Sequence, residues 1–386
     1  MAAPPDLFVV GRFPPPIDGQ TLATARCVEA LEAAFRVSRL DTEPPSGDPL
    51  ASSPRFDLGR TVHYLALRRR LAQALAVAPR APVLWHAVSP APLGHLRDVL
   101  ATVPAFGPVR PVAAVLHRAL FEALLAHPVL RGSARRLVAR LNAVVVQSPR
   151  LGERLAPWVP AERVRVIPNP VSPETVPTPE EVRAKQARRG EGGPLRLLFL
   201  SNMMPEKGYV DVLEAAARLH AQGLAFSLDL AGHWPAGPAR AQAEAFVASH
   251  SLGAVVRIPG GVAGQADVRR LHLAADVFLL PSYHPTETQP IAILEALSAG
   301  TPVVTLRRDV MEDMITDGVE GRLVPARAPE AIAEAVVHLA IPDVWRSASA
   351  AARRRFERDF SPAVVAEAWR ALAADLARLG PAGRQR

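Results

Sequence analysis

The sequence predicts an α/β fold made of two doubly wound domains, and three observations support this. Short apolar segments alternate with helical patterns, which is typical of a parallel sheet covered by helices on both faces. The alternation stops near residue 170 and restarts near residue 195. The length of 386 residues exceeds what one ordinary hydrophobic core accommodates, so two domains are expected.

In the first expected domain, residues 1–170, short apolar runs predict the strands. They cover residues 7–10, 82–85, 112–116, 143–146 and 164–167. A helix is expected over 20–35. Residues 171–194 are rich in Pro, Glu, Arg and Gly and lack a long apolar run, so we expect a linker there.

In the second expected domain, residues 195–360, the same alternation returns. The expected strands cover residues 195–200, 226–230, 276–280 and 302–305. A helix is expected over 209–221. Residues 361–386 are expected to form a C-terminal helix. The sequence leaves open whether this helix packs against the first domain.

The composition indicates a globular chain in a reducing compartment. The sequence is 49% hydrophobic and 21% charged. Its one cysteine, Cys27, excludes an internal disulfide and suits a small core position. The first residues lack the pattern of a signal peptide, and no apolar run is long enough to span a bilayer. We therefore expect a cytoplasmic protein, either soluble or peripheral on the inner face of the membrane.

The net charge of +8 comes almost entirely from arginine. Such a charge suits a nucleic acid, an anionic membrane or an anionic substrate. No zinc-finger spacing or RNA-binding aromatic motif accompanies it, so no nucleic-acid partner is expected. Basic clusters at Arg68–Arg70 and along 131–140 are compatible with a solvated face or with peripheral contact to anionic lipid.

Glu287 and Glu295 flank the start of an expected helix that follows the strand at 276–280. Pro290 suits the first helical position, and Gly300 suits the position just past the last. Ligands of parallel sheets bind at the carboxyl ends of the strands. A carboxylate there can accept hydrogen bonds from sugar hydroxyls, and a helix N-terminus attracts phosphate. Both glutamates would otherwise be surface residues that stabilise the helix dipole.

Lys207 lies in a Pro-Glu-Lys-Gly turn between an expected strand and an expected helix. A cation at this place stabilises the charge that grows on a departing diphosphate. A solvated lysine at a helix start is the simpler alternative. The chain has only two lysines, at 185 and 207, among many arginines, which favours a function for the one in this turn.

Together these motifs resemble the retaining glycosyltransferases of family 4, also called group 1. The resemblance rests on Pro205–Gly208, on the Glu-x7-Glu spacing with the following Gly-Thr-Pro-Val-Val, on Val164–Asn169 and on Ala275–Ser282. It covers about residues 5–360. It implies the GT-B fold, which is two Rossmann-like domains facing a central cleft.

The resemblance also implies roles for individual residues. Glu287 would contact the donor sugar, Glu295 the ribose hydroxyls and Lys207 the diphosphate. His117 would lie near the reacting carbon, so His117, Glu287 and Lys207 are the expected catalytic residues. The other expected donor contacts are Gly19, Asn202, Thr288, Gln289, Pro290 and Ile291. His86 follows a strand in the same way as His117 and competes with it for the same role.

Three places depart from the family pattern. Arg118 and Ala119 follow His117 where the family often has glycines, which crowds the site. Asn202 stands where the family usually has an arginine, so it can donate a hydrogen bond but supplies no charge. Thr288–Ile291 replaces the usual Gly-Phe-Gly-Leu, and Pro290 has no N–H to offer a phosphate. No Asp-x-Asp pair occurs in the sequence, so we expect no metal ion and no cofactor apart from the nucleotide sugar.

The sequence therefore predicts a metal-independent retaining glycosyltransferase, with hexosyl transfer favoured. The donor would be a UDP- or GDP-sugar. The acceptor would be a hydroxyl of a saccharide, a lipid-linked saccharide or a small molecule. A nucleotide-sugar epimerase of the same architecture and a non-catalytic nucleotide-sugar-binding protein are the alternatives.

Overall fold

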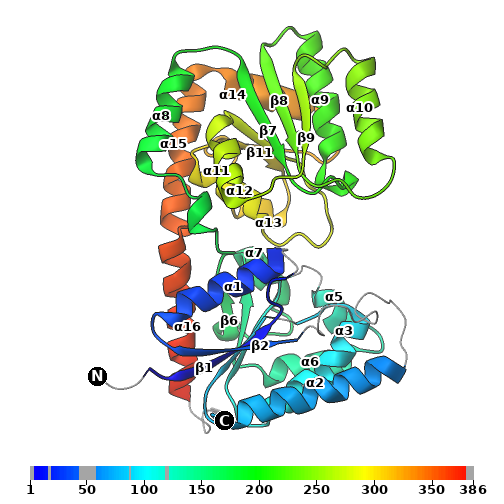
Figure 1. Ribbon diagram of the computed structural model, residues 1–386, viewed down its shortest axis with the longest axis vertical. Coiled ribbons are helices and arrows are strands. Elements are labelled where there is room, and N and C mark those ends of the chain that lie inside the picture. Colours follow the sequence, from blue (N-terminus) through cyan, green and yellow to red (C-terminus); the bar gives the residue numbers. More distant parts are fainter. Residues whose placement is uncertain (1–3, 16–18, 43–57, 87, 118–120, 380–386) are drawn as a thin grey trace. The chain divides into compact units, whose positions relative to one another are not determined.

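The computed structural model describes residues 4–15, 19–42, 58–86, 88–117 and 121–379 (Figure 1). The chain divides into two compact units. One is formed by Met1–Pro170 with Ala363–Arg386, and the other by Val171–Pro362. Each unit contains a six-stranded sheet whose strand pairs are all parallel. The predicted doubly wound α/β fold is confirmed.

The sheet of the first unit has the strand order β2-β1-β3-β4-β5-β6. Its strands are β1 (Asp6–Gly11), β2 (Arg36–Asp41), β3 (Val83–Trp85), β4 (Val112–Val115), β5 (Ala143–Val146) and β6 (Val164–Val166). Its helices are α1 (Gly19–Glu32), α2 (Leu58–Ala76), α3 (Pro92–Arg97), α4 (Val103–Phe106), α5 (Phe121–Ala126), α6 (Arg131–Arg140) and α7 (Pro149–Leu155). A short π-helical stretch, Asp98–Thr102, joins α3 to α4.

The C-terminal helix α16 (Pro362–Leu379) completes the core of the first unit. Figure 1 draws it in red beside α1 and β1. Its residues Val365, Trp369 and Leu376 pack in one buried cluster with residues of β1, α1 and the central strands. The last segment of the described chain thus covers the sheet formed by the first.

The sheet of the second unit has the order β12-β11-β10-β7-β8-β9. Its strands are β7 (Leu195–Leu200), β8 (Phe226–Ala231), β9 (Val256–Gly260), β10 (Val277–Leu280), β11 (Val303–Leu306) and β12 (Gly321–Val324). Its helices are α8 (Pro179–Gly190), α9 (Tyr209–Ala221), α10 (Ala239–Ser249), α11 (Gln265–Ala274), α12 (Ile291–Ser298), α13 (Asp309–Glu312), α14 (Pro329–Ala340) and α15 (Pro342–Asp359).

Residues 171–194 differ from the linker expected there, because the structure places α8 in them. Thr178 and Glu181 form a capping box at its start, which fixes the first turn of the helix. Val182 and Lys185 are buried. The helix is polar overall, and its two buried positions lie three residues apart on one face, so the sequence carries little apolar signal for it.

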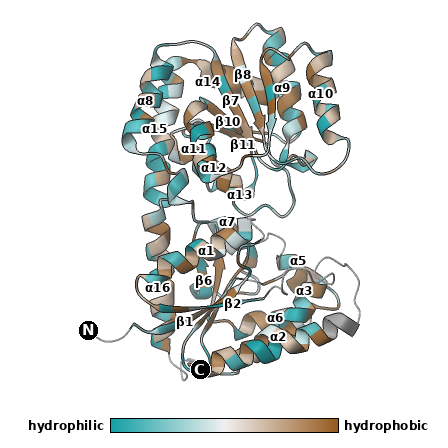
Figure 2. Cartoon of the chain, viewed as in Figure 1, coloured by the Kyte–Doolittle hydropathy of each residue, from teal (hydrophilic) through white to brown (hydrophobic). Residues whose placement is uncertain are grey.

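The strands that the sequence does not predict are β2, β9 and β12, and all three are edge strands. Three of the six residues of β2 are charged, and β9 contains Pro259, which a central strand does not tolerate. An edge strand is covered on fewer sides than a central strand and so needs fewer apolar residues. Figure 2 shows the contrast, since the central strands of both units are drawn mostly in brown.

Candidate functional site

Lys207 and Glu287 lie together at the carboxyl end of the second sheet. Lys207 ends a short 3-10 turn after β7, and Glu287 lies in the loop after β10, which pairs with β7. Their side chains form an ion pair with 2.5 Å between Lys207 Nζ and Glu287 Oε2. The Ser282 hydroxyl donates to the same carboxylate oxygen at 3.0 Å. Two neighbouring loops therefore hold this carboxylate through a cation and a hydroxyl.

Gly208 allows these two loops to meet. It has a φ of +85°, in the left-handed region that favours glycine. A Cβ atom here would lie 2.4 Å from the carbonyl oxygen of Pro281. Beside it, the Tyr283 N–H donates to the Glu206 carbonyl at 2.8 Å. The Pro-Glu-Lys-Gly turn thus packs backbone to backbone on the segment that leads to Glu287.

Helix α12 begins just after this loop. Pro290 was predicted to be the first helical residue, but it is the N-cap, with φ −62° and an extended ψ of 117°, and the helix begins one residue later at Ile291. Gly300 ends the helix as predicted, with φ +58°. The N–H groups of Gly300 and Thr301 donate to Leu297 and Ala296 in a Schellman motif. The first N–H groups of the helix, beginning at Ile291, have no partner within the helix and form its positive end.

The other predicted donor residues of this unit differ in exposure. Thr288 and Gln289 are buried in the loop between Glu287 and α12. Asn202 is exposed in the loop after β7, and its carbonyl accepts the N–H of Met204 at 2.8 Å. The loop that carries Asn202 ends at the turn that carries Lys207.

Glu295 is the fifth residue of α12 and is nearly buried. Its Oε2 lies 3.8 Å from Nε2 of His272, a buried residue of α11. Sequence reasoning missed His272 and also Ser282, although Ser282 belongs to the motif that ends the β10 segment. The signal for His272 was a histidine among apolar residues four positions before Asp276. Such a histidine reads as a core residue until its neighbours are known.

In the first unit, His86 and His117 contact each other. They follow β3 and β4, which are paired strands, and His86 Nδ1 lies 3.2 Å from His117 Nε2. His86 is fully buried. Burial lowers the pKa of His86 well below its ordinary value, and the nearby charge of His117 lowers it further. The sequence offered His86 and His117 as alternatives for the same role. In the structure they form a hydrogen-bonded pair.

The start of α1 lies beside this pair. Gln20 donates from Nε2 to the His86 carbonyl at 2.8 Å. A Cβ atom at Gly11 would lie 2.9 Å from the His86 Cβ, so glycine allows the end of β1 to approach. Gly19 opens α1 with no atom of the described chain within 4 Å of its Cβ position. Packing within the described chain therefore gives no reason for glycine at position 19.

The basic residues of α6 divide into two pairs. Arg135 donates to the Leu125 carbonyl, and Arg140 donates to the carbonyls of Gly107 and Arg110. Arg131 and Arg136 are exposed. Arg135 is exposed as well and so also presents charge to the surroundings, whereas Arg140 is partly buried. No helix within the described ranges is long and apolar enough to cross a membrane.

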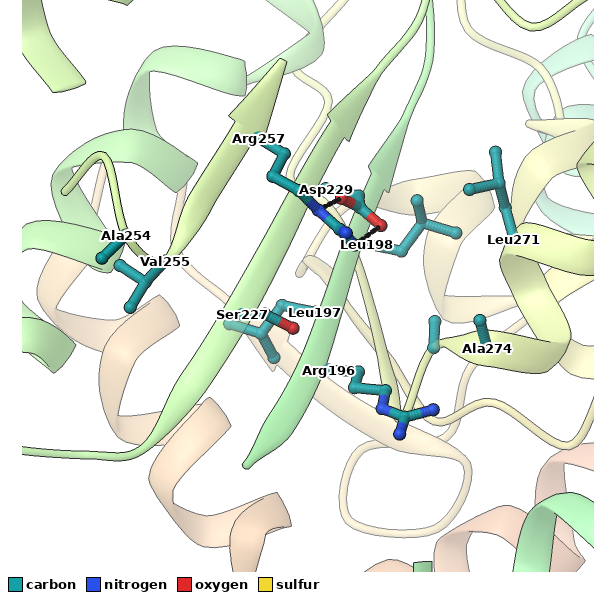
Figure 3. Close-up of a pocket in the computed structure, with 11 residues that line it drawn as sticks. Arg196, Leu197, Leu198, Ser227, Asp229, Ala254, Val255, Arg257, Leu271 and Ala274 are labelled. Atoms are coloured by element: carbon teal, nitrogen blue, oxygen red, sulfur yellow. Dashed lines mark hydrogen bonds and ion pairs between the residues drawn. The ribbon is translucent and has the colours of Figure 1, made fainter. Parts of the chain in front are cut away.

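A pocket of about 390 Å³ lies in the second unit, away from the predicted donor residues (Figure 3). It is lined by residues of β7 and β8, such as Arg196 near the start of β7 and Asp229 in the middle of β8. Arg257 pairs with Asp229 through two hydrogen bonds of 2.6 and 2.8 Å. The predicted donor residues lie at the opposite, carboxyl ends of the strands. This pocket is therefore separate from the candidate donor site.

Within the part of the chain that the structure describes, no group of three or more His, Cys, Asp or Glu residues is arranged to hold a metal ion. Lys207 and the start of α12 are positive groups at the candidate donor site.

Comparison with known families identifies the chain. A model of the family "Glycosyltransferase Family 4" matches residues 18–175, and a model of "Glycosyl transferases group 1" matches residues 181–341. Together they cover most of both units. The chain belongs to the group 1, family 4 glycosyltransferases.

Curated members of this group show the same relationship over part of their length. The amylovoran biosynthesis glycosyltransferase AmsK of Erwinia amylovora is 28% identical over 235 residues, which cover 58% of this chain and 53% of AmsK. A phosphatidyl-myo-inositol mannosyltransferase of Mycobacterium tuberculosis is 32% identical over 190 residues, 47% of this chain and 48% of that protein. The chain thus spans about half the length of the curated relatives it matches.

A solved glycosyltransferase structure matches nearly the whole chain. HepE of Anabaena, in complex with UDP and glucose, aligns with a TM-score of 0.65 and 17% identity. The alignment covers 96% of this chain and 98% of HepE. At this identity the likeness shows the fold alone, which is the two-domain GT-B architecture.

Proposed function

We propose that the protein is a retaining glycosyltransferase that moves a hexose from a nucleotide-diphosphate sugar to a hydroxyl group. The observation that carries this proposal is the Lys207–Glu287 pair beside the N-terminus of α12. An ammonium group has three N–H donors, and Glu287 accepts one of them. The others suit a diphosphate, whose charge the helix start also stabilises.

In the proposed reaction, the bond between the anomeric carbon and the diphosphate oxygen breaks first. Its electron pair goes to the diphosphate, which Lys207 and the N–H groups of α12 stabilise. The acceptor hydroxyl then attacks the same face of the sugar. Its proton passes to the departing phosphate oxygen, so no protein nucleophile is required. Glu287 orients the sugar hydroxyls, and much of the rate comes from this positioning.

We assign His117 to the sugar near its reacting carbon, and Gly19 to the phosphate. The His86–His117 hydrogen bond supports the first assignment, because it fixes the orientation of the His117 ring. Glu295 is assigned to the ribose hydroxyls and Asn202 to the diphosphate. The backbone of Thr288, Gln289 and Ile291 completes the donor site.

UDP-hexoses are the first donors to test, with GDP-hexoses second. HepE was solved with UDP and glucose, and one relative is named a mannosyltransferase, which supports a hexose donor. No divalent ion is needed in the proposed mechanism, since Lys207 and the helix start supply positive charge. Turnover should therefore persist in EDTA.

The deciding experiment combines binding with product analysis. A donor that binds the folded state raises the unfolding temperature, so UDP- and GDP-hexoses are screened by thermal shift. The donor that binds is then incubated with saccharide acceptors, and the product linkage is determined by NMR. An α-linked product from an α-linked donor supports the proposal. An inverted linkage contradicts the retaining mechanism, and the absence of any shift contradicts donor binding.

A non-catalytic nucleotide-sugar-binding protein is the second candidate, and Asn202 favours it. The exposed amide at this position carries no charge, so it stabilises a departing diphosphate less than an arginine does. A binding protein would show the thermal shift but release no nucleotide diphosphate over many hours. Release that depends on an acceptor excludes this candidate.

We also propose a peripheral membrane contact through Arg131 and Arg136. They are exposed on α6, and one relative has phosphatidyl-myo-inositol in its name, which supports testing a lipid-linked acceptor. Sedimentation with vesicles containing anionic lipid should exceed that with neutral vesicles. Replacing both arginines by glutamine should remove the difference. Equal sedimentation with the two vesicle types would exclude the contact.

A further inference from the structure

His272 is a buried polar residue whose ring has no hydrogen-bond partner among the described residues. Its side chain lies on α11 and is 1% exposed. Its ring packs against Phe278 of β10, with 5.1 Å between the ring centroids. Neither Nδ1 nor Nε2 makes a hydrogen bond. Leaving such a group unsatisfied destabilises a fold, so native proteins rarely keep one without a function for it.

The ring points to one ionisable neighbour, which is Glu295. The distance between His272 Nε2 and Glu295 Oε2 is 3.8 Å. This is too long for a hydrogen bond, but an approach of roughly 1 Å brings the two atoms to hydrogen-bonding distance. Glu295 itself is 9% exposed, so most of its carboxylate environment comes from the protein.

The backbone of His272 is fixed to the helix that carries Glu295. The His272 carbonyl accepts hydrogen bonds from Lys185 Nζ and from Thr301 Oγ1, each at 3.0 Å. Lys185 Nζ also donates to the carbonyl of Ala299, which follows the last residue of α12, at 3.1 Å. These contacts join the end of α11 to the end of α12. The imidazole is therefore held beside Glu295 while its own nitrogens stay unsatisfied.

We propose that His272 is a positioning residue for Glu295, in an arrangement that rests on the function proposed above. When the nucleotide binds, the Nε2–H of His272 donates to one oxygen of the Glu295 carboxylate. The other oxygen then faces the ribose hydroxyls in a fixed orientation. His272 touches neither the donor nor the reacting carbon, and it acts only through Glu295.

The test compares two substitutions at His272. His272→Phe keeps a flat ring against Phe278 but removes both unsatisfied nitrogens. His272→Gln places an N–H donor near the position of Nε2. We expect His272→Phe to weaken binding of the nucleoside diphosphate roughly tenfold, because a hydrogen bond to a charged group is lost. His272→Gln should stay within about threefold of the parent protein.

Stability separates positioning from packing. A packing role predicts that His272→Phe changes the unfolding temperature and leaves nucleotide affinity alone. The positioning role predicts weaker binding with an equal or higher unfolding temperature, because the unsatisfied nitrogens are gone. The donor KM should rise while kcat changes by less than about threefold, since the ribose lies away from the reacting bond.

A double-mutant cycle with Glu295→Ala provides the sharpest test. If His272 acts through Glu295, His272→Phe has no further effect on nucleotide affinity in the Glu295→Ala protein. Additive losses would overturn the proposal, as would an unchanged affinity in His272→Phe or in Glu295→Ala alone. Failure of the proposed function shows in the parent protein, which would bind no nucleotide sugar. Failure of this inference shows only in the variants.

Discussion

At the carboxyl ends of the first sheet, two bases contact each other, His86 and His117. At the same ends of the second sheet, the cation Lys207 contacts the carboxylate Glu287. Both pairs come from loops after neighbouring strands. One architecture thus holds an ion pair in the second unit and a pair of imidazoles, one of them fully buried, in the first.

The difference shows which unit is suited to each part of a nucleotide sugar. A diphosphate needs positive charge, and Lys207 with the start of α12 is suited to supply it. The imidazole pair suits a neutral group such as a sugar hydroxyl, since burial keeps His86 uncharged. These features support the proposed roles, in which Lys207 binds the diphosphate and His117 lies near the sugar.

The largest effect should come from Lys207→Ala. We expect kcat to fall by about 10²–10³, because one donor to the developing charge is removed. The fold should remain, since within the described ranges the side chain of Lys207 forms its ion pair with Glu287. Steady-state kinetics and circular dichroism measure the two outcomes. Arg196→Gln is the matched control, because it removes an exposed cation from the same strand segment at the far pocket.

Near-normal turnover in Lys207→Ala would remove the ion pair from the mechanism. It would also remove the contrast between the two units, since neither unit would then supply a charge on which turnover depends. An equal loss in Arg196→Gln would point instead to a general effect of net charge.

The next largest effect should come from Gly208→Ala, which separates the two loops of the second unit. The residue must hold a φ of +85°, and its new Cβ would lie 2.4 Å from the Pro281 carbonyl. We expect a loss of about 2 kcal/mol or more in the free energy of unfolding. Activity should fall with it, because Lys207 is the neighbouring residue. Denaturant unfolding measures the change, and an unaltered midpoint would show that the loops do not pack in this way.

The sequence predicted the central strands and the loops that carry Lys207 and Glu287. It could do so because buried strands need continuous apolar runs, and because each of these motifs is local. It did not predict the edge strand β2, in which three of the six residues are charged. Nor did it predict α8, whose few buried residues give no periodic signal.

Contacts between distant residues were beyond the sequence. Lys185 and His272 are 87 positions apart, and they meet only because α8 packs beside α11. His86 and His117 are 31 positions apart, and their contact depends on β3 and β4 being neighbours in the sheet. A motif gives residue types and spacing, but not which strands are adjacent. The sequence motifs therefore gave the residues proposed to contact the donor, but not the residues that pack beside them.

A smaller effect should appear in the pH dependence of stability. The pKa of His86 is lowered in the folded protein, so the unfolded chain binds its proton more readily. Burial of His86 therefore does not reduce the free energy of unfolding above the unfolded pKa near 6.5, but it reduces this free energy as the pH falls below that value. His86→Phe should flatten the acid side of the stability curve by at most about 1.4 kcal/mol per pH unit.

A histidine of the second unit provides the comparison. The pKa of His284 is lowered too, mainly by partial burial, but its side chain is half-exposed. His284→Gln should therefore change the slope much less than His86→Phe. Urea titrations between pH 5 and 8 measure both slopes. If the two variants give the same slope, burial does not distinguish the two histidines.

The smallest effect should come from Gly19→Ala, which tests whether the first unit touches the donor. No atom of the described chain lies within 4 Å of its Cβ position, and the residue begins a helix. Alanine should therefore change the free energy of unfolding by less than about 0.5 kcal/mol. If the backbone at Gly19 approaches the diphosphate, the added methyl group raises the donor KM roughly threefold to tenfold. Gly132→Ala, on α6 and equally open, is the control. A rise in KM for Gly19→Ala alone extends the donor site into the first unit, and equal KM values would confine it to the second.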